Sequence, residues 1–187
     1  MSLTAVPAPQ GAAAQQVVDA RQFRDAMALL AAPVTIVTTV DTDGRRRGFT
    51  ASAVTSVSAE PPLLLVGVTR GTGCHQPLLA AGEFVVNVLG AHHGELARRF
   101  AASGVDRFAG GEFEEWPGSG LPYLPDAAVA LRCTTAGVVA AGDHDLLLGT
   151  PAGTHEHGSS GALVWYQRAF HVPVQTFQDG KAAVHAA

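Results

Sequence analysis

The sequence has little lysine and cysteine and no long apolar run. It contains one lysine, Lys181, and its net charge is −4, so a basic surface that follows nucleic-acid phosphates is not expected. The two cysteines, Cys74 and Cys133, have no metal-ligand spacing. No apolar run approaches the roughly 20 residues that cross a bilayer, and no signal-peptide pattern opens the chain. These absences predict a cytoplasmic protein without nucleic-acid or membrane partners.

Two common nucleotide-binding motifs are also missing. No Gly-x-Gly-x-x-Gly sequence follows a predicted strand, and no Gly-x-x-x-x-Gly-Lys sequence occurs. Neither a Rossmann site nor a P-loop is therefore expected. Any dinucleotide would have to bind this protein in another way.

The composition is that of one compact domain. Of the 187 residues, 47% are hydrophobic and only 15% are charged, which is enough apolar material for a sizeable core. Residues 1–18 are rich in Ala, Pro and Gln and are expected to form a flexible tail. The domain is expected to span residues 19–172, and residues 173–187 are expected to form a second tail.

Apolar periodicity and turn residues predict more strand than helix. The expected strands are residues 34–40, 48–57, 63–69, 84–89, 128–139, 145–157 and 162–167, and the expected helices are 21–32, 77–81 and 94–102. Strands and helices do not alternate strictly, so a parallel doubly wound sheet is not favoured. The pattern predicts a mainly β protein, a closed antiparallel β-barrel with peripheral helices.

The most informative segment is the run of small residues between Gly48 and Pro62. The side chains of residues 50–53 are short, so a flat ligand could reach the backbone N–H and C=O groups there. The same segment offers hydroxyl donors and acceptors, namely Thr50, Ser52, Thr55, Ser56 and Ser58. Alternating Thr or Ser with Ala or Val is equally typical of an ordinary half-buried strand. Both interpretations stay open on these residues alone.

Several smaller patterns have a structural and a functional interpretation. The turn Gly71–Pro77 leads into a helix start, where free N–H groups favour an anion, but it is also an ordinary strand-to-helix turn. Cys74 beside His75 could suggest a thiolate nucleophile, although no third orienting group is evident. The triple arginine at 45–47 follows Asp-Gly and is typical of a solvated hairpin tip.

The histidines allow similar alternatives. His92 with His93, and His155 with His157, could hold a metal, but no further ligand completes a tetrahedral set, so no metal site is predicted. His144 lies between two aspartates in a predicted hairpin turn, an arrangement that could orient its imidazole. A plain turn explains the same residues.

Taken in order, the motifs of this chain resemble those of the short-chain flavin reductases, the FMN-binding split-barrel family. The resemblance spans roughly residues 23–170. The matching segments are residues 23–27, 33–39, 48–58, 61–63, 84–89, 96–100, 106–110, 142–144 and 164–166. It implies an antiparallel split barrel of Greek-key type that reduces FMN or FAD with NADH or NADPH and supplies reduced flavin to a partner monooxygenase, as a homodimer.

The resemblance also implies a set of site residues. Residues 50–53 are expected at the isoalloxazine edge, Gly73–His75 near the phosphate, and His144 beside the nicotinamide as the catalytic residue. The full cofactor-binding set is Thr50, Ala51, Ser52, Ala53, Ser56, Gly73, Cys74, His75, Asn87, Arg107, Phe108 and Tyr166.

Two other functions remain compatible with the same sequence. One is an oxidase or monooxygenase of the same fold that retains its flavin. The other is a non-enzymatic flavin- or haem-binding barrel, for which His75, His144 or His155 could be ligands. The choice between FMN and FAD, and between NADH and NADPH, stays open.

Overall fold

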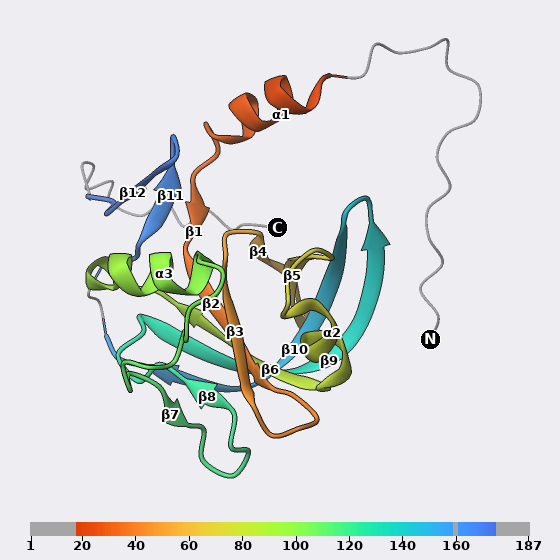
Figure 1. The fold of residues 1–187 in the computed structure, drawn as a ribbon, viewed down its shortest axis with the longest axis vertical. Coiled ribbons are helices and arrows are strands. Elements are labelled where there is room, and N and C mark those ends of the chain that lie inside the picture. Colours follow the sequence, from red (N-terminus) through yellow and green to blue (C-terminus); the bar gives the residue numbers. More distant parts are fainter. Residues whose placement is uncertain (1–17, 159–160, 175–187) are drawn as a thin grey trace.

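The structure is a computed structural model that describes residues 18–158 and 161–174. In this part of the chain the α-helices are α1 (Ala20–Met27), α2 (His75–Ala80) and α3 (Gly94–Ala101), and a short 3-10 helix, η1 (Ala91–His93), precedes α3. The strands are β1 (Ala32–Pro33), β2 (Thr35–Val40), β3 (Arg46–Ala51), β4 (Val54–Ala59), β5 (Pro62–Thr69), β6 (Glu83–Val88), β7 (Glu114–Glu115), β8 (Pro122–Tyr123), β9 (Val129–Ala141), β10 (His144–Glu156), β11 (Val164–Tyr166) and β12 (Ala169–His171). The fold is mainly β with helices at its periphery, as predicted (Figure 1).

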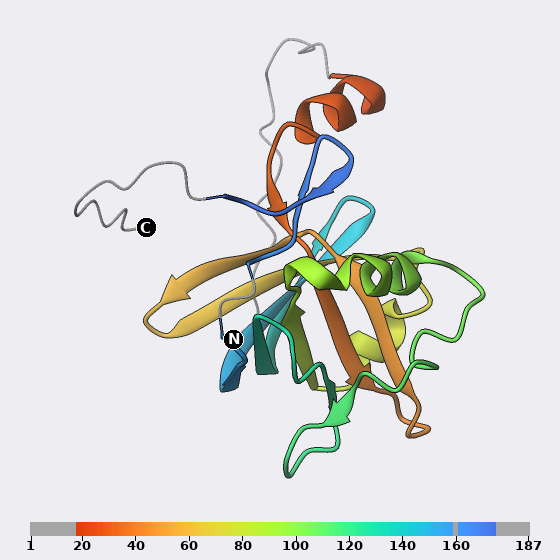
Figure 2. The same cartoon turned by 90° about the vertical axis from the view of Figure 1, so that its left-hand side faces the viewer.

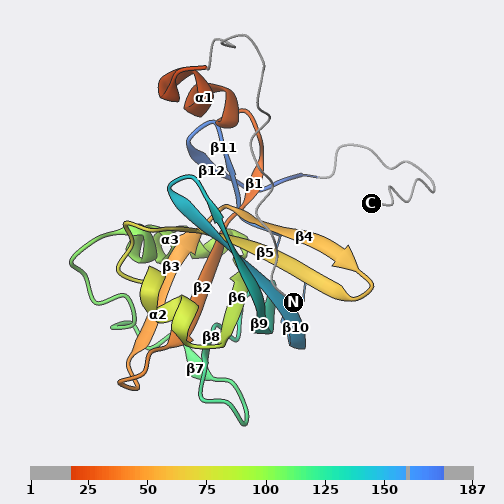
Figure 3. The ribbon, with the colours of Figure 1, turned by 90° about the vertical axis from the view of Figure 1, so that its right-hand side faces the viewer.

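Seven strands form one curled antiparallel sheet in the order β3-β2-β6-β9-β10-β5-β4. β3 and β4 are consecutive in the chain but lie at opposite ends of this order. The sheet curls so that these ends approach each other, and the Gly67 amide of β5 donates a 2.7 Å hydrogen bond to the Ala53 carbonyl, between β3 and β4. The β4–β5 hairpin extends outward from the body (Figures 2 and 3).

Two smaller sheets flank the large one. β1, β11 and β12 form the first, which lies beside α1, and β7 pairs with β8 in the second (Figure 1). The first sheet continues directly into the large one, because Pro33 of β1 is followed by a single residue before β2 begins. The β11–β12 hairpin is thereby held close to the start of β2.

The core lies between the central strands and α3. Leu96, Ala97 and Phe100 recur at helical spacing on one face of α3, and all three are buried. Phe100 is fully buried and packs edge-on against Phe108. The Phe100 ring also lies against Gly48 of β3, because a Cβ atom there would be 2.9 Å from the ring. Removal of a buried Phe side chain typically lowers stability by about 3–5 kcal/mol, so the Phe100 ring anchors α3 over β3.

Helix α1 projects away from the rest of the molecule (Figure 1). Asp19 caps it, since its Oδ1 accepts hydrogen bonds of 2.8 Å from the Arg21 and Gln22 amides. The helix ends at Met27, earlier than the predicted residue 32, because the next amides turn back onto carbonyls three residues earlier. Its apolar side chains Phe23 and Met27 are 58% and 44% exposed.

The predicted strand at residues 48–57 is wrong as a single element. The chain forms β3 and then β4, and Ser52 and Ala53 connect them across the sheet. The predicted hairpin tip at Arg45–Arg47 is also displaced. The turn lies at residues 42–44, and Arg46 and Arg47 already belong to β3. Both differences matter for the site, as described below.

Two predictions fall largely on residues that the structure does not describe. The predicted N-terminal tail lies outside the described residues except for Val18, and the predicted C-terminal tail except for Pro173 and Val174. None of the described helices is long and apolar enough to cross a membrane.

Candidate functional site

The site is built around the point where the chain crosses from β3 to β4. Ser52 and Ala53 lie outside both strands, so their backbone is not occupied by a continuous ladder. Gly67 lies directly against this crossing. A Cβ atom on Gly67 would come within 2.9 Å of the Ala53 Cβ, a separation that real Cβ atoms do not adopt. The close approach of β5 to the crossing therefore requires glycine at this position.

A central cavity of about 290 Å³ opens over the crossing. β3 and the crossing, β5, α3 and the tip of the β9–β10 hairpin all contribute to its walls. The lining residues are Phe49, Thr50, Ala51, Ser52, Ala53, Gly67, Thr69, Thr72, Phe100, Ala101, Arg107 and His144. The small residues that the sequence singled out are thus brought to one wall of a cavity, with His144 among the other walls.

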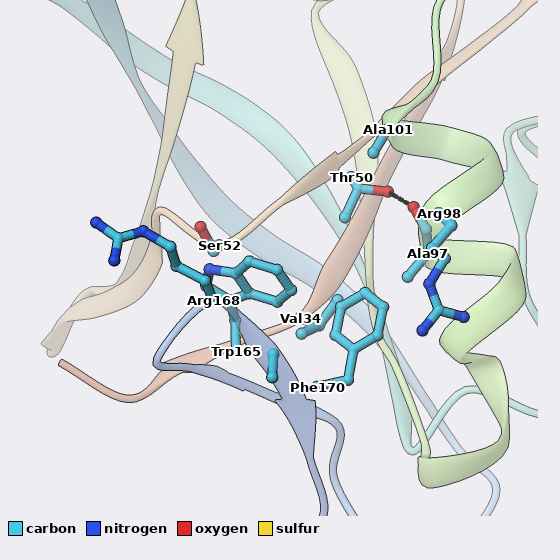
Figure 4. A pocket seen from close by; sticks show the side chains of 10 residues that line it. Val34, Thr50, Ser52, Ala97, Arg98, Ala101, Trp165, Arg168 and Phe170 are labelled. Carbon is cyan, nitrogen blue, oxygen red and sulfur yellow. Dashed lines mark hydrogen bonds between the residues drawn. The ribbon is translucent and has the colours of Figure 1, made fainter. Parts of the chain in front are cut away.

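A larger aromatic cavity of about 590 Å³ adjoins the central one and shares Thr50, Ser52 and Ala101 with it. It lies between α3 and the β11–β12 hairpin, and Trp165 and Phe170 project into it from the hairpin (Figure 4). The Thr50 hydroxyl donates a 2.6 Å hydrogen bond to the Ala97 carbonyl of α3. This bond ties α3 to β3 at the boundary of the two cavities.

A basic cavity of about 400 Å³ lies on another side of the central one. Arg46, Arg47 and Arg107 line it together with Gly73 and Cys74. Arg107 also lines the central cavity. Its guanidinium is held in place, because it donates hydrogen bonds to the Gly48 carbonyl (2.7 Å) and the Ala102 carbonyl (2.8 Å). The three cavities, called the groove below, therefore have one cationic end and one aromatic end.

His144 opens strand β10 and lies directly opposite Thr69 of β5 in the strand register. The His144 Nε2 atom is 2.8 Å from the Thr69 hydroxyl, and Nδ1 is 2.7 Å from the Asp143 carboxylate. This hydrogen bond to His144 holds the pKa of Asp143 below its ordinary value. Both ring nitrogens of His144 therefore have partners within the protein.

A second ion-pair network is centred on Asp145, the residue that follows His144. Asp145 receives hydrogen bonds from Arg70 (2.8 Å) and pairs with His75 Nε2 (2.7 Å). The hydrogen bond from Arg70, and next in size the one with His75, lower the pKa of Asp145 to about 2. His75 is buried and is not among the residues that line the groove. The imidazole that the sequence placed near a phosphate instead anchors α2 to β10.

Most of the predicted site residues do line the groove. They are Thr50, Ala51, Ser52, Ala53, Gly73, Cys74, Arg107, Phe108 and His144. Cys74 is buried, and its Sγ lies 3.2 Å from the Gly48 carbonyl, so the structure gives this thiol a packing role rather than the arrangement of a nucleophile.

Four predicted site residues do not line the groove, namely Ser56, His75, Asn87 and Tyr166. Asn87 is fully buried, and its amide bonds to the Ile36 carbonyl (2.9 Å) and the Leu124 amide (2.8 Å), so it cannot reach a ligand in this structure. Ser56 lies in β4, on the outward hairpin, and is absent from the groove lining. Tyr166 lies in β11 next to Trp165, but it is the neighbour, Trp165, that lines the aromatic cavity.

The structure also adds residues that the sequence analysis did not propose. Thr69 and Thr72 line the central cavity, and Trp165 and Phe170 line the aromatic one. The strand register would have identified Thr69, because it pairs directly with His144. Trp165 lies in the matching segment 164–166, but only the folded hairpin brings it and Phe170 next to α3.

His92, His93 and Asp126 form the one group of possible metal ligands among the described residues. The Gly90 amide donates a 3.0 Å hydrogen bond to His93 Nδ1, so the proton of the neutral ring is on Nε2, which faces Asp126 at 3.2 Å. Burial lowers the pKa of His93 and favours this neutral ring. A metal would need the Nε2 lone pair, so the donor set does not fit one. His155 Nε2 is within 3.1 Å of the Pro125 carbonyl instead.

Known proteins are similar to this chain in sequence and in fold. An enzyme of Streptomyces pristinaespiralis named NADH:riboflavin 5′-phosphate oxidoreductase is 53% identical over 164 residues, which is 87% of this chain and 93% of that enzyme. The solved structure of the Streptomyces globisporus NADH:FAD oxidoreductase with NAD and FAD fragments superposes with a TM-score of 0.79 at 30% identity, covering 88% of this chain and all of that one.

A third similarity concerns the flavin reductase component of a bacterial two-component tryptophan halogenase. Its structure matches with a TM-score of 0.77 at 30% identity over 84% of this chain and 100% of that chain. The sequence profile of the flavin reductase like domain matches residues 27–173, which include every element that lines the groove. The chain therefore belongs to the flavin reductase-like domain family.

Proposed function

We propose that this protein is an NADH-dependent flavin reductase and that its groove binds FMN. The observation that carries the proposal is the groove itself, in which an open backbone segment lies between a cationic cavity and His144. The 53% identical relative, named for NADH and riboflavin 5′-phosphate, supports the choice of both substrates. Bound flavin would supply the hydride-accepting chemistry, and the groove would hold it beside the nicotinamide.

The chain's own residues fit each part of FMN. The single phosphate is complementary to the cavity of Arg46, Arg47 and Arg107, since guanidinium groups form strong charge-assisted hydrogen bonds with phosphate. The ring edge carries donors and acceptors that match the Ser52–Ala53 backbone. Donors fixed at that edge stabilise the negative charge that develops on reduction, and α3 excludes water from one side. His144 is the residue proposed beside the nicotinamide.

Reduced flavin is proposed to leave the protein and supply a partner monooxygenase. The tryptophan halogenase reductase component supports this role, because it is part of a two-component system. A diffusible product requires modest flavin affinity, so purified protein is expected to be nearly colourless. A stoichiometric yellow protein that keeps its flavin through dialysis would instead identify a flavin-retaining oxidase.

Flavin selectivity tests the phosphate assignment. In Arg107→Met the KM for FMN should rise about 10- to 150-fold while the KM for riboflavin changes little, because a hydrogen bond to a charged group contributes about 1.5–3 kcal/mol. Arg45→Met is the matched control, since Arg45 is exposed and does not line the groove. Equal effects of Arg107→Met on FMN and riboflavin would refute the phosphate site.

Exposed apolar side chains on α1 and directly beside it support a homodimer. Val18, Phe23, Met27, Leu29 and Leu30 are 44–62% exposed, and contiguous apolar side chains of this kind favour association. α1 is fixed to the body by the Arg168–Asp25 ion pair and by the Gln167 amide on the Ala28 carbonyl (2.7 Å), so this face is presented in a defined direction.

Light scattering during size-exclusion chromatography tests the dimer. Wild-type protein should have twice the chain mass, and Phe23→Glu should shift the equilibrium towards one chain. A monomeric wild type would contradict the proposal. We also propose that residues 19–172 form the catalytic domain and that it works in the cytoplasm, where buried free cysteines such as Cys74 and Cys133 stay reduced.

A further inference from the structure

The hydrogen-bond chain Asp143–His144–Thr69 has a defined polarity when the His144 ring is neutral. An ionised carboxylate can only accept hydrogen bonds, so the 2.7 Å contact with Asp143 places a proton on His144 Nδ1. In the neutral imidazole the other nitrogen, Nε2, is then an acceptor. The lowered pKa of Asp143 is consistent with a carboxylate in this position. In that neutral ring the Thr69 hydroxyl is the donor and Nε2, 2.8 Å away, is the acceptor.

This polarity determines which atom faces a ligand. Nδ1 of His144 is used by Asp143, and Nε2 is used by Thr69, so neither ring nitrogen is free to bond a substrate. The Thr69 hydroxyl proton is used in this hydrogen bond, but the oxygen keeps two lone pairs that can accept. Oγ1 has no other hydrogen-bond partner among residues 18–158 and 161–174. Thr69 lines the central cavity beside His144 and is exposed.

The surroundings of Thr69 keep this position accessible. Gly67 lies two residues earlier on the same face of β5, and a Cβ there would be 3.9 Å from the His144 Cδ2 atom. The absence of that side chain leaves space in the cavity between the crossing and the Thr69–His144 pair. An oriented acceptor thus lines the same cavity as Ser52 and Ala53.

We propose that the Thr69 hydroxyl oxygen is the group that accepts a hydrogen bond from the carboxamide NH2 of the reduced nicotinamide, and that His144 and Asp143 are positioning residues that hold this hydroxyl as an acceptor. The inference rests on the proposed NADH-dependent flavin reduction. It assigns substrate recognition to Thr69, and it moves His144 from direct contact to support. A nicotinamide that lacks the NH2 group loses this recognition.

The experiment compares NADH with reduced 3-acetylpyridine adenine dinucleotide, in which a methyl group replaces the NH2. Both are assayed as hydride donors with saturating FMN. Thr69→Val removes the hydroxyl without changing side-chain shape much, and it should lower kcat/KM for NADH about fivefold, the typical effect of one neutral hydrogen bond. For the acetylpyridine donor kcat/KM should stay within about twofold. Thr69→Ser should restore most of the preference for NADH.

Thr55→Val is the matched control, because Thr55 is an exposed threonine of β4 that does not line the groove. The melting temperature of each variant shows that it is folded. An equal loss with both donors after Thr69→Val would overturn the inference, and so would no loss with either. A change confined to the KM for FMN would show that the hydroxyl serves the flavin instead, and it too would overturn the inference.

The variant His144→Ala separates contact from positioning. If His144 only holds the hydroxyl, His144→Ala reduces the NADH preference partly, and Thr69→Val in the His144→Ala background equals Thr69→Val alone. If His144→Ala removes the whole preference while Thr69→Val does not, His144 contacts the carboxamide and the inference is wrong. Failure of wild-type protein to oxidise NADH with FMN would instead contradict the proposed function, so the two outcomes are distinguishable.

Discussion

Replacing Gly67 with alanine should disturb the groove where β5 meets the crossing between β3 and β4. The added Cβ would lie 2.9 Å from the Ala53 Cβ, whereas carbon atoms in favourable contact are about 3.5–4.0 Å apart. The crossing between β3 and β4 must therefore move by about 0.6 Å or more. Ala53 cannot move freely, because its carbonyl accepts the 2.7 Å hydrogen bond from the Gly67 amide itself.

Two opposing effects determine the size of the change. Alanine reduces the conformational freedom of the unfolded chain, which stabilises a protein by about 0.4–1 kcal/mol where the backbone permits it. Overpacking destabilises by about 1–3 kcal/mol, and Gly67 is buried although Ala53 is exposed, so the overlap should prevail. At about 2–4 °C per kcal/mol for a chain of this size, the melting temperature should fall by up to about 10 °C. The KM for FMN should rise about tenfold as the Ala53 backbone moves.

Thermal unfolding and steady-state kinetics on Gly67→Ala measure both effects. Gly71→Ala is the control, because a Cβ at Gly71 meets nothing within 4 Å and this residue does not line the groove. Gly71→Ala should keep wild-type kinetics and stability. A Gly67→Ala protein with wild-type melting temperature and wild-type KM for FMN would refute the close contact between β5 and the crossing.

Three further predictions concern the framework. Asn87→Ala removes the side-chain partner of the buried Leu124 amide, so urea unfolding should show a loss of about 1–3 kcal/mol; a neutral result would mean that water replaces the side chain. Because Arg70 lowers the pKa of Asp145 from 3.8 to about 2, its stabilisation is complete above about pH 4 and is lost as pH falls through about 2. In Asp145→Asn the urea midpoint should depend much less on pH across that acid range. An unchanged pH dependence counts against the ion pair. In Gly149→Ala the Cβ would lie 2.5 Å from Phe84 Cζ, so stability should fall by about 1–3 kcal/mol while the KM for FMN stays unchanged; a raised KM contradicts this separation.

The sequence predicted the fold class because its signals are local. Turn residues such as Gly82, which has a positive φ after α2, and apolar periods within α3 act over a few positions. The order of motifs then supplied the family and, with it, most of the groove. Strand alternation alone could not reveal that residues 48–57 form two strands, because no Gly or Pro marks the break at Ser52 and Ala53.

The predicted site residues that do not line the groove share one feature, which is the direction of their side chains. Asn87 lies in β6 with its side chain pointing into the protein. Its amide forms hydrogen bonds with Ile36 of β2 and with Leu124 in a loop. His75 turns towards Asp145 because that carboxylate lies on β10, 70 residues later in the chain. Neither direction is encoded within the local segment. Trp165 was missed for the complementary reason, since it meets α3 only after the β11–β12 hairpin has folded.

The α1 prediction shows a further limit of sequence reasoning. Its apolar residues predict a short helix, and Phe23 and Met27 of that helix are exposed in the single chain. Periodicity identifies an apolar face, but it does not identify the surface that covers that face. The proposed homodimer accounts for this exposure, and light scattering tests it.

The most direct test of the central claim is NADH oxidation measured with added FMN, riboflavin or no flavin. Without oxygen, one NADH should be consumed for each FMN bleached, because one hydride reduces one flavin. We expect no oxidation without flavin, and a higher kcat/KM for FMN than for riboflavin because Arg107 and its neighbours form a cationic cavity. Absence of FMN-dependent NADH oxidation by folded protein would contradict the account.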